Sequence, residues 1–559
     1  MELKLEKLVD KFWLLLILAF SIPAVWALFV PGFYGASDDL HIGWLYEMDR
    51  AIQSGQFPPR FVPDLSFGFG YPLFNFVFPL PFYLGEIFHK LGFSLVDSVK
   101  SVFLISLISS ALAMYFLLKE FTTKLLSLAG ALIYLYTPYR ATDVYVRGAI
   151  GESLAFVFPP LILLSVYKIC TRKSDLSWVG AGVLSITGLI LSHNIATYIF
   201  LPFIIALAIF LFLIKPERQL LLRFALMLFL SLSAASYFWI PVLVDSGLMK
   251  YDTVFDFRDH FPTLIQLIKP FFGYGASVPG PYDGMSFFIG SLNILLIVLA
   301  GVGLIKLRKK YSFFQKTILI WSLITLTVVV FMMNYRSTFL WQHIPLLPYF
   351  QFPWRFLMMT TFVTPLLVIG LEGIKFKQQL AVFLMLGAVF LNWSYFRPHD
   401  FLGRTDSYYL NRYIPYPEAS EDYKQTQEEY LRLPRLASKR PDKNFPLVIT
   451  EDNSKVDINK VNSLHQIITI STSSSQLINY NKYNFPGWGV KVNGQKQELG
   501  TGQPFGQITF SIPAGTNKVE VYFTETRFKL FLDIMSLSAI LVSLGFLINT
   551  LSIRKKHDV

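Results

Sequence analysis

Long apolar segments are the feature that most restricts what this chain can fold into. A bilayer core about 30 Å thick is crossed by about 20 consecutive apolar residues in a helix, or by a few more or fewer if the helix tilts. Runs of roughly this length lie near 12–30, 98–118, 122–138, 153–170, 177–192, 196–214, 220–242, 286–305, 316–333, 355–373, 378–395 and 527–550. We therefore predict a polytopic α-helical membrane protein with about twelve transmembrane helices.

The composition agrees with this class and argues against others. The chain is 53% hydrophobic and only 15% charged, unlike an ordinary soluble protein. Its net charge of +12 comes from short Lys and Arg clusters between apolar runs, which is typical of topology signals and not of a nucleic-acid surface. A single cysteine, Cys170, excludes internal disulfides and a Cys-based zinc site.

The basic clusters predict the orientation of the chain. They are Lys4/Lys7/Lys11, Arg172/Lys173, Lys215/Arg218, Lys306/Arg308/Lys309/Lys310, Lys375/Lys377 and Arg554/Lys555/Lys556. With both termini cytoplasmic, all clusters fall inside only if an even number of spans precedes residue 172. That parity excludes the apolar segment 71–90 as a span, and its prolines also suit a continuous helix poorly. We predict an interfacial or re-entrant element within a long outer loop, 31–97.

Three regions follow from these patterns. Residues 1–395 would form the transmembrane domain, 396–526 a polar lead-in and a β-rich domain outside the cytoplasm, and 527–559 a final transmembrane helix with a basic cytoplasmic tail. The segments "HQIITIST", "GVKVNGQKQEL", "QITFSI" and "NKVEVYFTE" alternate with period two, and Asn493-Gly494 is a hairpin signal. A β-sandwich-like domain is expected there.

Two adjacent acids, Asp38 and Asp39, stand where the first apolar run gives way to water. One interpretation is that either acid caps the following helix, whose apolar stripe suits the membrane interface. The other is that a carboxylate in a loop over helix ends serves as a general base or metal ligand for chemistry on a lipid-borne substrate. One acid can cap while its neighbour does chemistry.

Several segments resemble a known family. The run from "SDDLH" through "GQFPPRFVPDLSFGFGYPLFNFVFPLPFYLGE", with "PYRATDVYVRGAIGE", "YFWIPVL" and "QFPWRFL", resembles the bacterial 6-pyruvoyl-tetrahydropterin-synthase-related membrane proteins. The later "YNFPGWGVKVNG" is similar to the closing domain of YfhO-like proteins. Both resemble the GT-C glycosyltransferase superfamily. The resemblance implies transfer of a sugar from a polyprenyl-phosphate carrier to an acceptor at the outer membrane face, with an acidic residue after the first helix.

That resemblance suggests roles for particular residues. Asp38, or else Asp39, would be the general base of an inverting transfer, since a lipid phosphate leaves without a general acid. A divalent metal, Mg or Mn, would be held by Asp38, Asp39 and Glu152 if one is used. The candidate substrate-binding residues are His41, Arg60, Tyr71, Asn75, Arg140, Arg147, Glu152, His193, Asn194 and Arg355.

Each candidate also has a structural interpretation. The arginines suit phosphate oxygens, yet arginines at helix ends also reach toward lipid headgroups. Glu152 would pair with Arg147 or bind metal, His41 would orient Asp38 or lie in the interface, and His193-Asn194 would touch substrate or complete a turn between helices.

The functional expectation is a membrane glycosyltransferase with alternatives of other classes. Its partners would be membrane lipids, a polyprenyl-phosphate sugar and an envelope acceptor, such as a glycan, teichoic acid, lipid or protein, and not nucleic acid. A transporter or flippase of lipid-linked glycans would instead favour charges at mid-membrane depth. A non-catalytic scaffold that binds envelope glycans and an enzyme using a diphosphate-linked donor remain alternatives. The expected location is the plasma membrane.

Overall fold

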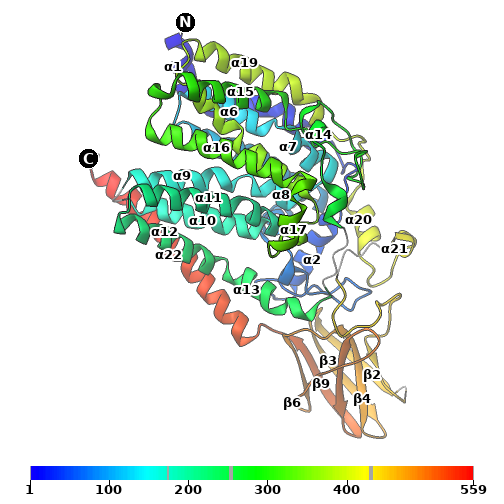
Figure 1. Cartoon of the computed structure of the whole chain (residues 1–559). Coiled ribbons are helices and arrows are strands. Elements are labelled where there is room, and N and C mark those ends of the chain that lie inside the picture. Colours follow the sequence, from blue (N-terminus) through cyan, green and yellow to red (C-terminus); the bar gives the residue numbers. More distant parts are fainter. Residues whose placement is uncertain (1, 173–174, 251–255, 427–431, 453, 558–559) are drawn as a thin grey trace.

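A bundle of roughly parallel helices carries a layer of loops and short helices at one end, with a β-domain beyond that layer (Figure 1). The computed structural model describes residues 2–172, 175–250, 256–426, 432–452 and 454–557. Both termini lie at the end of the bundle opposite the loops (Figure 1). The predicted lead-in and tail include residues 427–431 and 558–559, which lie outside the described residues.

The bundle is built from helices that lie in the predicted apolar runs (Figure 1). They are α1 (Glu2–Val25), α5 (Leu95–Leu118), α6 (Lys124–Leu135), α9 (Phe158–Thr171), α10 (Ser177–Ser192), α11 (Asn194–Ile214), α12 (Arg218–Ala234), α13 (Ser236–Asp245), α15 (Ser291–Lys306), α16 (Phe313–Met332), α18 (Leu357–Val363), α19 (Lys377–Asn392) and α22 (Arg527–His557). Each predicted apolar run overlaps at least one of these helices, and in the run 355–373 the 3-10 helices Pro353–Phe356 and Pro365–Leu371 flank α18.

The helices establish a polytopic membrane protein. By length and composition, seven helices of the described chain can cross a membrane, or up to eight if α12 and α13, bent by 66°, form one span. The shorter apolar helices α6, α10 and α15 fall in three more of the predicted runs. The number twelve stays a prediction, because 12 to 16 helical residues reach only about 18–24 Å.

The first long loop contains three helices and lies over the bundle end (Figure 1). It contains α2 (His41–Gln53), α3 (Leu73–Phe76) and α4 (Leu80–Lys90). The segment 71–90 forms two short helices, α3 with four residues and α4 with eleven. Neither is long enough to span a bilayer.

The capping interpretation of the two acids is wrong. The N-cap position of α2 is occupied by Leu40, which has no side-chain acceptor.

The β-domain is a sandwich of two antiparallel sheets. One sheet has the order β1-β4-β8-β7 and the other β2-β3-β9-β5-β6. The strands are β1 (Val448–Ile449), β2 (Lys455–Asn462), β3 (His465–Thr472), β4 (Gln476–Tyr483), β5 (Trp488–Val492), β6 (Gln495–Gln497), β7 (Gly500–Thr501), β8 (Gln507–Ile512) and β9 (Gly515–Phe523). Asn493 and Gly494, with φ of 50° and 86°, form the tight turn between β5 and β6.

Arg60 connects the first loop to the final helix. Its Nε lies 2.6 Å from Glu525 Oε1, its Nη2 lies 2.8 Å from Asp533 Oδ1, and its Nη1 donates to the Tyr237 carbonyl at 2.9 Å. The Arg60 side chain is buried. The loop, α13 and α22 are therefore held together by one guanidinium, immediately beside the start of the β-domain's membrane anchor.

We expect Arg60→Met to lower the free energy of unfolding by about 3–5 kcal/mol, because it removes one partner of a buried ion cluster. The measurement is the thermal unfolding midpoint of the full chain in detergent. Arg258→Met is the control: Arg258 forms an exposed pair with Asp256, and such pairs contribute about 0–1 kcal/mol. Equal midpoints for the two variants would show that the Arg60 cluster does not stabilise the fold.

Candidate active site

A cavity of about 360 Å³, lined by both charged and apolar side chains, opens where the first loop covers the bundle. Its walls come from the first loop, from the segment between α6 and α9, from the turn between α10 and α11, and from the segment that leads into α18. The lining residues are Asp38, Leu40, His41, Trp44, Phe76, Val77, Phe78, Arg147, Ala149, Gly151, Glu152, His193, Asn194, Ile195 and Arg355.

Backbone hydrogen bonds place Asp38 beside Arg147. The Ser37 N–H donates to the Val146 carbonyl at 3.2 Å, and the Asp38 N–H donates to the Arg147 carbonyl at 2.7 Å. The wide helical turn η2 (Thr142–Arg147) ends at Gly148, whose φ is +71°. A Cβ at Gly148 would lie 2.9 Å from the Ala36 Cβ, so glycine is needed for this close approach.

Glu152 is the centre of a buried ion network. Its Oε2 and Oε1 accept from Arg147 Nη1 and Nη2 at 2.6 and 2.9 Å, a two-point contact that fixes the guanidinium plane. Its Oε1 also lies 3.3 Å from Arg355 Nε and 3.8 Å from His193 Nε2. One carboxylate therefore gathers two arginines and a histidine at one wall of the cavity.

Two further members of this network were not among the predicted residues. The Tyr139 hydroxyl donates to Glu152 Oε2 at 3.0 Å, and Asp143 Oδ1 lies 3.1 Å from Arg147 Nη1. Burial and the Glu152 charge raise the pKa of Asp143 well above its usual range. The four-residue spacing of Asp143 and Arg147 along a helical turn was the available sequence signal.

Asp38 differs from Glu152 in its exposure. The Asp38 side chain is 37% exposed, whereas the Glu152 side chain is 1% exposed. Asp38 Oδ2 lies 3.7 Å from Arg147 Nη2, beyond hydrogen-bond distance. Partial burial raises the pKa of Asp38, while Arg147 opposes this shift. Asp38 thus offers an accessible carboxylate of increased basicity beside a fixed guanidinium.

Two histidines of the cavity are neutral at physiological pH. Burial lowers the pKa of both His41 and His193 to about 3. His193 Nδ1 accepts from the Ala196 N–H at 3.1 Å, so its proton resides on Nε2, the atom directed toward Glu152. His41 Nδ1 is buried and has no hydrogen-bond partner among the residues that the structure describes. His193 can therefore donate one hydrogen bond from Nε2, whereas His41 can donate or accept one.

Asp39 has a separate environment. It accepts a hydrogen bond from the Tyr413 hydroxyl, and its Oδ2 lies 3.6 Å from Arg404 Nη1. Its side chain is buried and is not part of the cavity lining. Tyr413 ends α20 (Asp406–Tyr413), so Asp39 joins the first loop to the lead-in of the β-domain.

Four other predicted residues are not brought to the cavity. Arg140 is buried, with Nη2 donating to Ser110 Oγ at 3.0 Å and Nη1 to the Ser153 carbonyl at 3.2 Å. Asn75 donates to Asp245 Oδ2 at 3.0 Å, and the Tyr71 hydroxyl accepts from the Arg432 N–H at 2.9 Å. With Arg60, these side chains connect elements of the fold instead of lining the site.

The predicted metal ligands do not form a ligand set. Of the three acids, Asp39 is bonded to Tyr413 and Glu152 to Arg147, and Arg147 lies between Glu152 and Asp38. Within the described ranges, no three His, Cys, Asp or Glu side chains are close enough together to hold a metal ion. A cation at this site would therefore have to compete with Arg147 for its ligands.

An apolar groove adjoins the cavity. It has a volume of about 330 Å³, lies between α11 and the α12–α13 pair, and shares Asn194 with the cavity. Its lining is almost entirely apolar, with Leu201, Pro202, Trp239 and Leu243 among its members. A ligand with a polar head and a long apolar tail would fill both spaces.

The fold and cavity define a polytopic membrane protein with a carboxylate and arginine site under its first long loop. The chain belongs to the family described as "6-pyruvoyl-tetrahydropterin synthase related domain; membrane protein", whose model matches residues 74–397. The match includes Arg147, Glu152, His193 and Arg355 but begins after Asp38.

Two individual proteins are also similar. An "Uncharacterized protein" of Lactococcus lactis subsp. cremoris (strain MG1363) is 26% identical over 232 residues, which are 38% of this chain and 37% of the relative. The arabinofuranosyltransferase AftD from Mycobacteria gives a TM-score of 0.44 at 14% identity, covering 69% of this chain and 27% of AftD. The chain therefore spans well under half of either protein, and a TM-score of this size does not establish a shared fold.

Proposed function

We propose that this protein is a GT-C-type membrane glycosyltransferase that moves a sugar from a polyprenyl-phosphate donor to an envelope acceptor, with inversion at the anomeric carbon. The observation that carries the proposal is the accessible Asp38 carboxylate beside Arg147 and Arg355 in one cavity. A base and phosphate-binding cations are what such a transfer requires.

The donor fits the two adjoining spaces. Arg355 and the neutral His193 both line the cavity, and His193 carries its proton on Nε2, so both side chains can donate to phosphate oxygens. The apolar groove beside Asn194 suits the prenyl chain. These features support a lipid phosphate over a soluble nucleotide sugar.

The reaction follows from this placement. Asp38 takes the proton of an acceptor hydroxyl as its oxygen bonds to the anomeric carbon. The bond between that carbon and the phosphate oxygen breaks, and its electron pair leaves with the polyprenyl phosphate. Arg147, Arg355 and His193 stabilise the added negative charge, most effectively because Glu152 has already fixed them in place.

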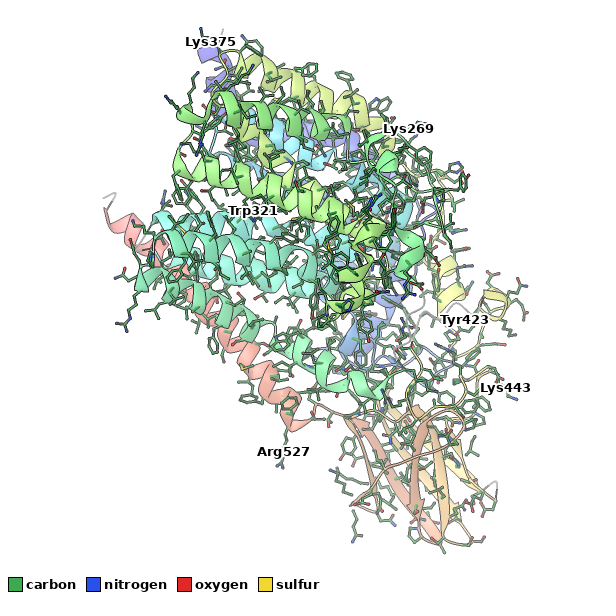
Figure 2. All side chains as sticks on the ribbon, in the orientation of Figure 1. Lys269, Trp321, Lys375, Tyr423, Lys443 and Arg527 are labelled. Carbon is green, nitrogen blue, oxygen red and sulfur yellow. The ribbon has the colours of Figure 1, made fainter. Side chains whose placement is uncertain are left out.

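The proposed orientation places the cavity and the β-domain outside the cytoplasm, with both termini inside. The basic loops near 306–310 and 375–377 lie together, since Lys310 Nζ donates to the Gly373 carbonyl at 3.0 Å. Lys375 lies close to the amino-terminal end of the bundle, opposite the loop layer and Lys269 (Figure 2). Positive charge gathered at that end supports a cytoplasmic assignment.

The test is sugar transfer by membranes that contain the full chain. Radiolabelled sugars on polyprenyl phosphate and on polyprenyl diphosphate are supplied separately, with envelope acceptors present. We expect label to enter an acceptor from the monophosphate donor and free polyprenyl phosphate to appear in equal amount. Label that crosses the membrane while still attached to its lipid would instead indicate a flippase, and no reaction with either donor would contradict the proposal.

The pH profile of transfer should have an acid limb set by Asp38. Its raised pKa means that kcat/KM falls as the pH decreases through a value above the ordinary 3.8 of a carboxyl group. The histidines, with pKa about 3, protonate only at lower pH. We therefore expect His41→Gln to keep this acid limb, and a limb that disappears in His41→Gln would assign the titration to His41.

A further inference from the structure

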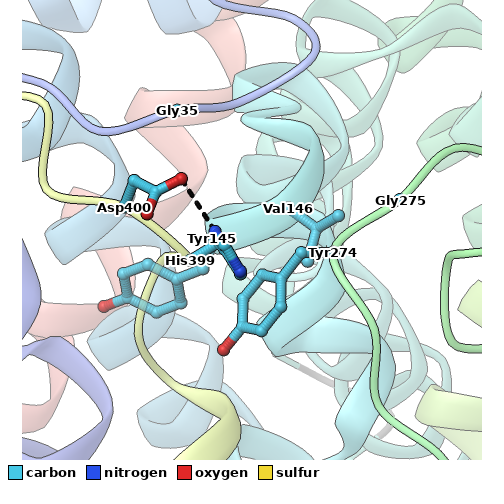
Figure 3. A pocket seen from close by; sticks show the side chains of 7 residues that line it. All are labelled: Gly35, Tyr145, Val146, Tyr274, Gly275, His399 and Asp400. Carbon is cyan, nitrogen blue, oxygen red and sulfur yellow. Dashed lines mark hydrogen bonds and ion pairs between the residues drawn. The ribbon is translucent and has the colours of Figure 1, made fainter.

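A second polar cavity, of about 510 Å³, lies on the loop layer (Figure 3). Its lining comes from four separate parts of the chain: Gly35 of the first loop, Tyr145 and Val146 of η2, Tyr274 and Gly275 of the segment before α15, and His399 and Asp400 after α19. The Asp400 carboxylate lies 2.7 Å from His399 Nδ1, as the dashed line in Figure 3 shows.

This cavity shares its wall with the candidate active site. Gly35 and Val146 line the second cavity, while Asp38 and Arg147 line the first. The backbone N–H groups of Ser37 and Asp38 donate to the carbonyls of Val146 and Arg147, so the segment 35–38 lies beside the segment 146–147. Three residues of extended chain reach at most about 10 Å, so Gly35 and Asp38 lie no further apart than the length of a few sugar units.

The lining chemistry differs from that of the donor cavity. Its seven lining residues include neither Lys nor Arg, and the Asp400 carboxylate would repel a phosphate. The Asp400 and His399 side chains can exchange hydrogen bonds with hydroxyl groups, and the Tyr274 ring packs edge-on against the His399 ring at 5.3 Å. Aromatic rings beside hydrogen-bonding side chains suit neutral polyhydroxyl molecules.

We propose that this cavity binds the neutral glycan part of the acceptor and directs its terminal hydroxyl toward Asp38. The inference rests on the proposed glycosyltransferase function and adds the substrate class of its second site. Tyr274, His399 and Asp400 would be the residues that recognise the acceptor.

The first experiment measures binding alone, on the full chain in detergent with Asp38→Asn and with no donor present, so that no transfer occurs. The probes are fluorescent trisaccharides of glucose, mannose, galactose and rhamnose, and a trisaccharide that ends in glucuronic acid. We expect a neutral probe to bind, the acidic probe to bind more weakly, and Tyr274→Ala and Asp400→Asn to weaken binding about tenfold, as loss of one hydrogen-bond-sized interaction would. Tyr282→Ala is the control, since Tyr282 is 88% exposed on the same segment and lies outside the lining.

The second experiment separates this inference from the proposed function. In otherwise wild-type protein, Tyr274→Ala and Asp400→Asn should raise the KM for the acceptor about tenfold and leave the KM for the donor unchanged. Transfer with an unchanged acceptor KM would overturn the inference and keep the function. Neutral-glycan binding without any transfer would keep the glycan site and overturn the function. Failure of every probe to bind would overturn the inference.

Discussion

Asp38→Asn should lower the rate of sugar transfer by about 10²–10⁴-fold while the amount of folded protein stays the same. The amide has the shape of the carboxylate but cannot take a proton from the acceptor hydroxyl. Little structure depends on the charge, because the Asp38 side chain is 37% exposed and its ion pair with Arg147 is 3.7 Å long. The measurement is initial transfer rate at saturating donor, normalised to protein detected in the same membranes.

Asp39→Asn is the matched control for Asp38→Asn. The amide oxygen of an asparagine can still accept from the Tyr413 hydroxyl, so the contact between loop and lead-in is kept. We expect Asp39→Asn to retain at least about a tenth of the wild-type rate, in line with a group that does no proton transfer. Loss of transfer in Asp39→Asn with normal transfer in Asp38→Asn would assign the base to Asp39.

The sequence was most informative where one physical rule dominates. Apolar length identified the membrane helices, and period-two alternation with Asn493-Gly494 identified strands and the turn between β5 and β6. Charge parity, with proline content, argued against a spanning helix at 71–90, and that segment forms α3 and α4. Apolar length and strand alternation concern short stretches of chain, and charge parity needs only the order of the basic clusters, so none of these rules requires the tertiary contacts to be known.

The site was harder to predict because it depends on pairings between distant segments. Arg140 and Arg147 are equivalent in the sequence, but Arg140 binds Ser110 and Ser153 whereas Arg147 faces the cavity. Arg60 forms ion pairs with Glu525 and Asp533, more than 460 residues further along the chain, and does not line the cavity. The sequence around an arginine does not indicate which distant carboxylate it will pair with. Ion pairs of this kind can be identified only once the tertiary structure is known.

Replacing Glu152 is the second change for which we expect a large effect. Glu152→Gln removes the charge that holds Arg147 and Arg355, leaving two guanidinium groups close together in a buried place. Removing one partner of a buried pair costs about 3–5 kcal/mol, so the thermal unfolding midpoint in detergent should fall sharply. Glu120→Gln is the control. It also removes a carboxylate from an ion pair, but that pair is with Lys168 and lies away from the cavity.

The Glu152→Gln variant also tests whether Arg147 and Arg355 bind the donor phosphate. If Arg147 and Arg355 bind the donor phosphate, pyrophosphate should raise the unfolding midpoint of Glu152→Gln more than that of the wild type, because the anion replaces the missing carboxylate between the guanidinium groups. Glu120→Gln should respond as the wild type does. A pyrophosphate effect that is the same in all three proteins would mean that the arginines and Glu152 form a structural cluster, and phosphate binding would then have to be assigned to other residues.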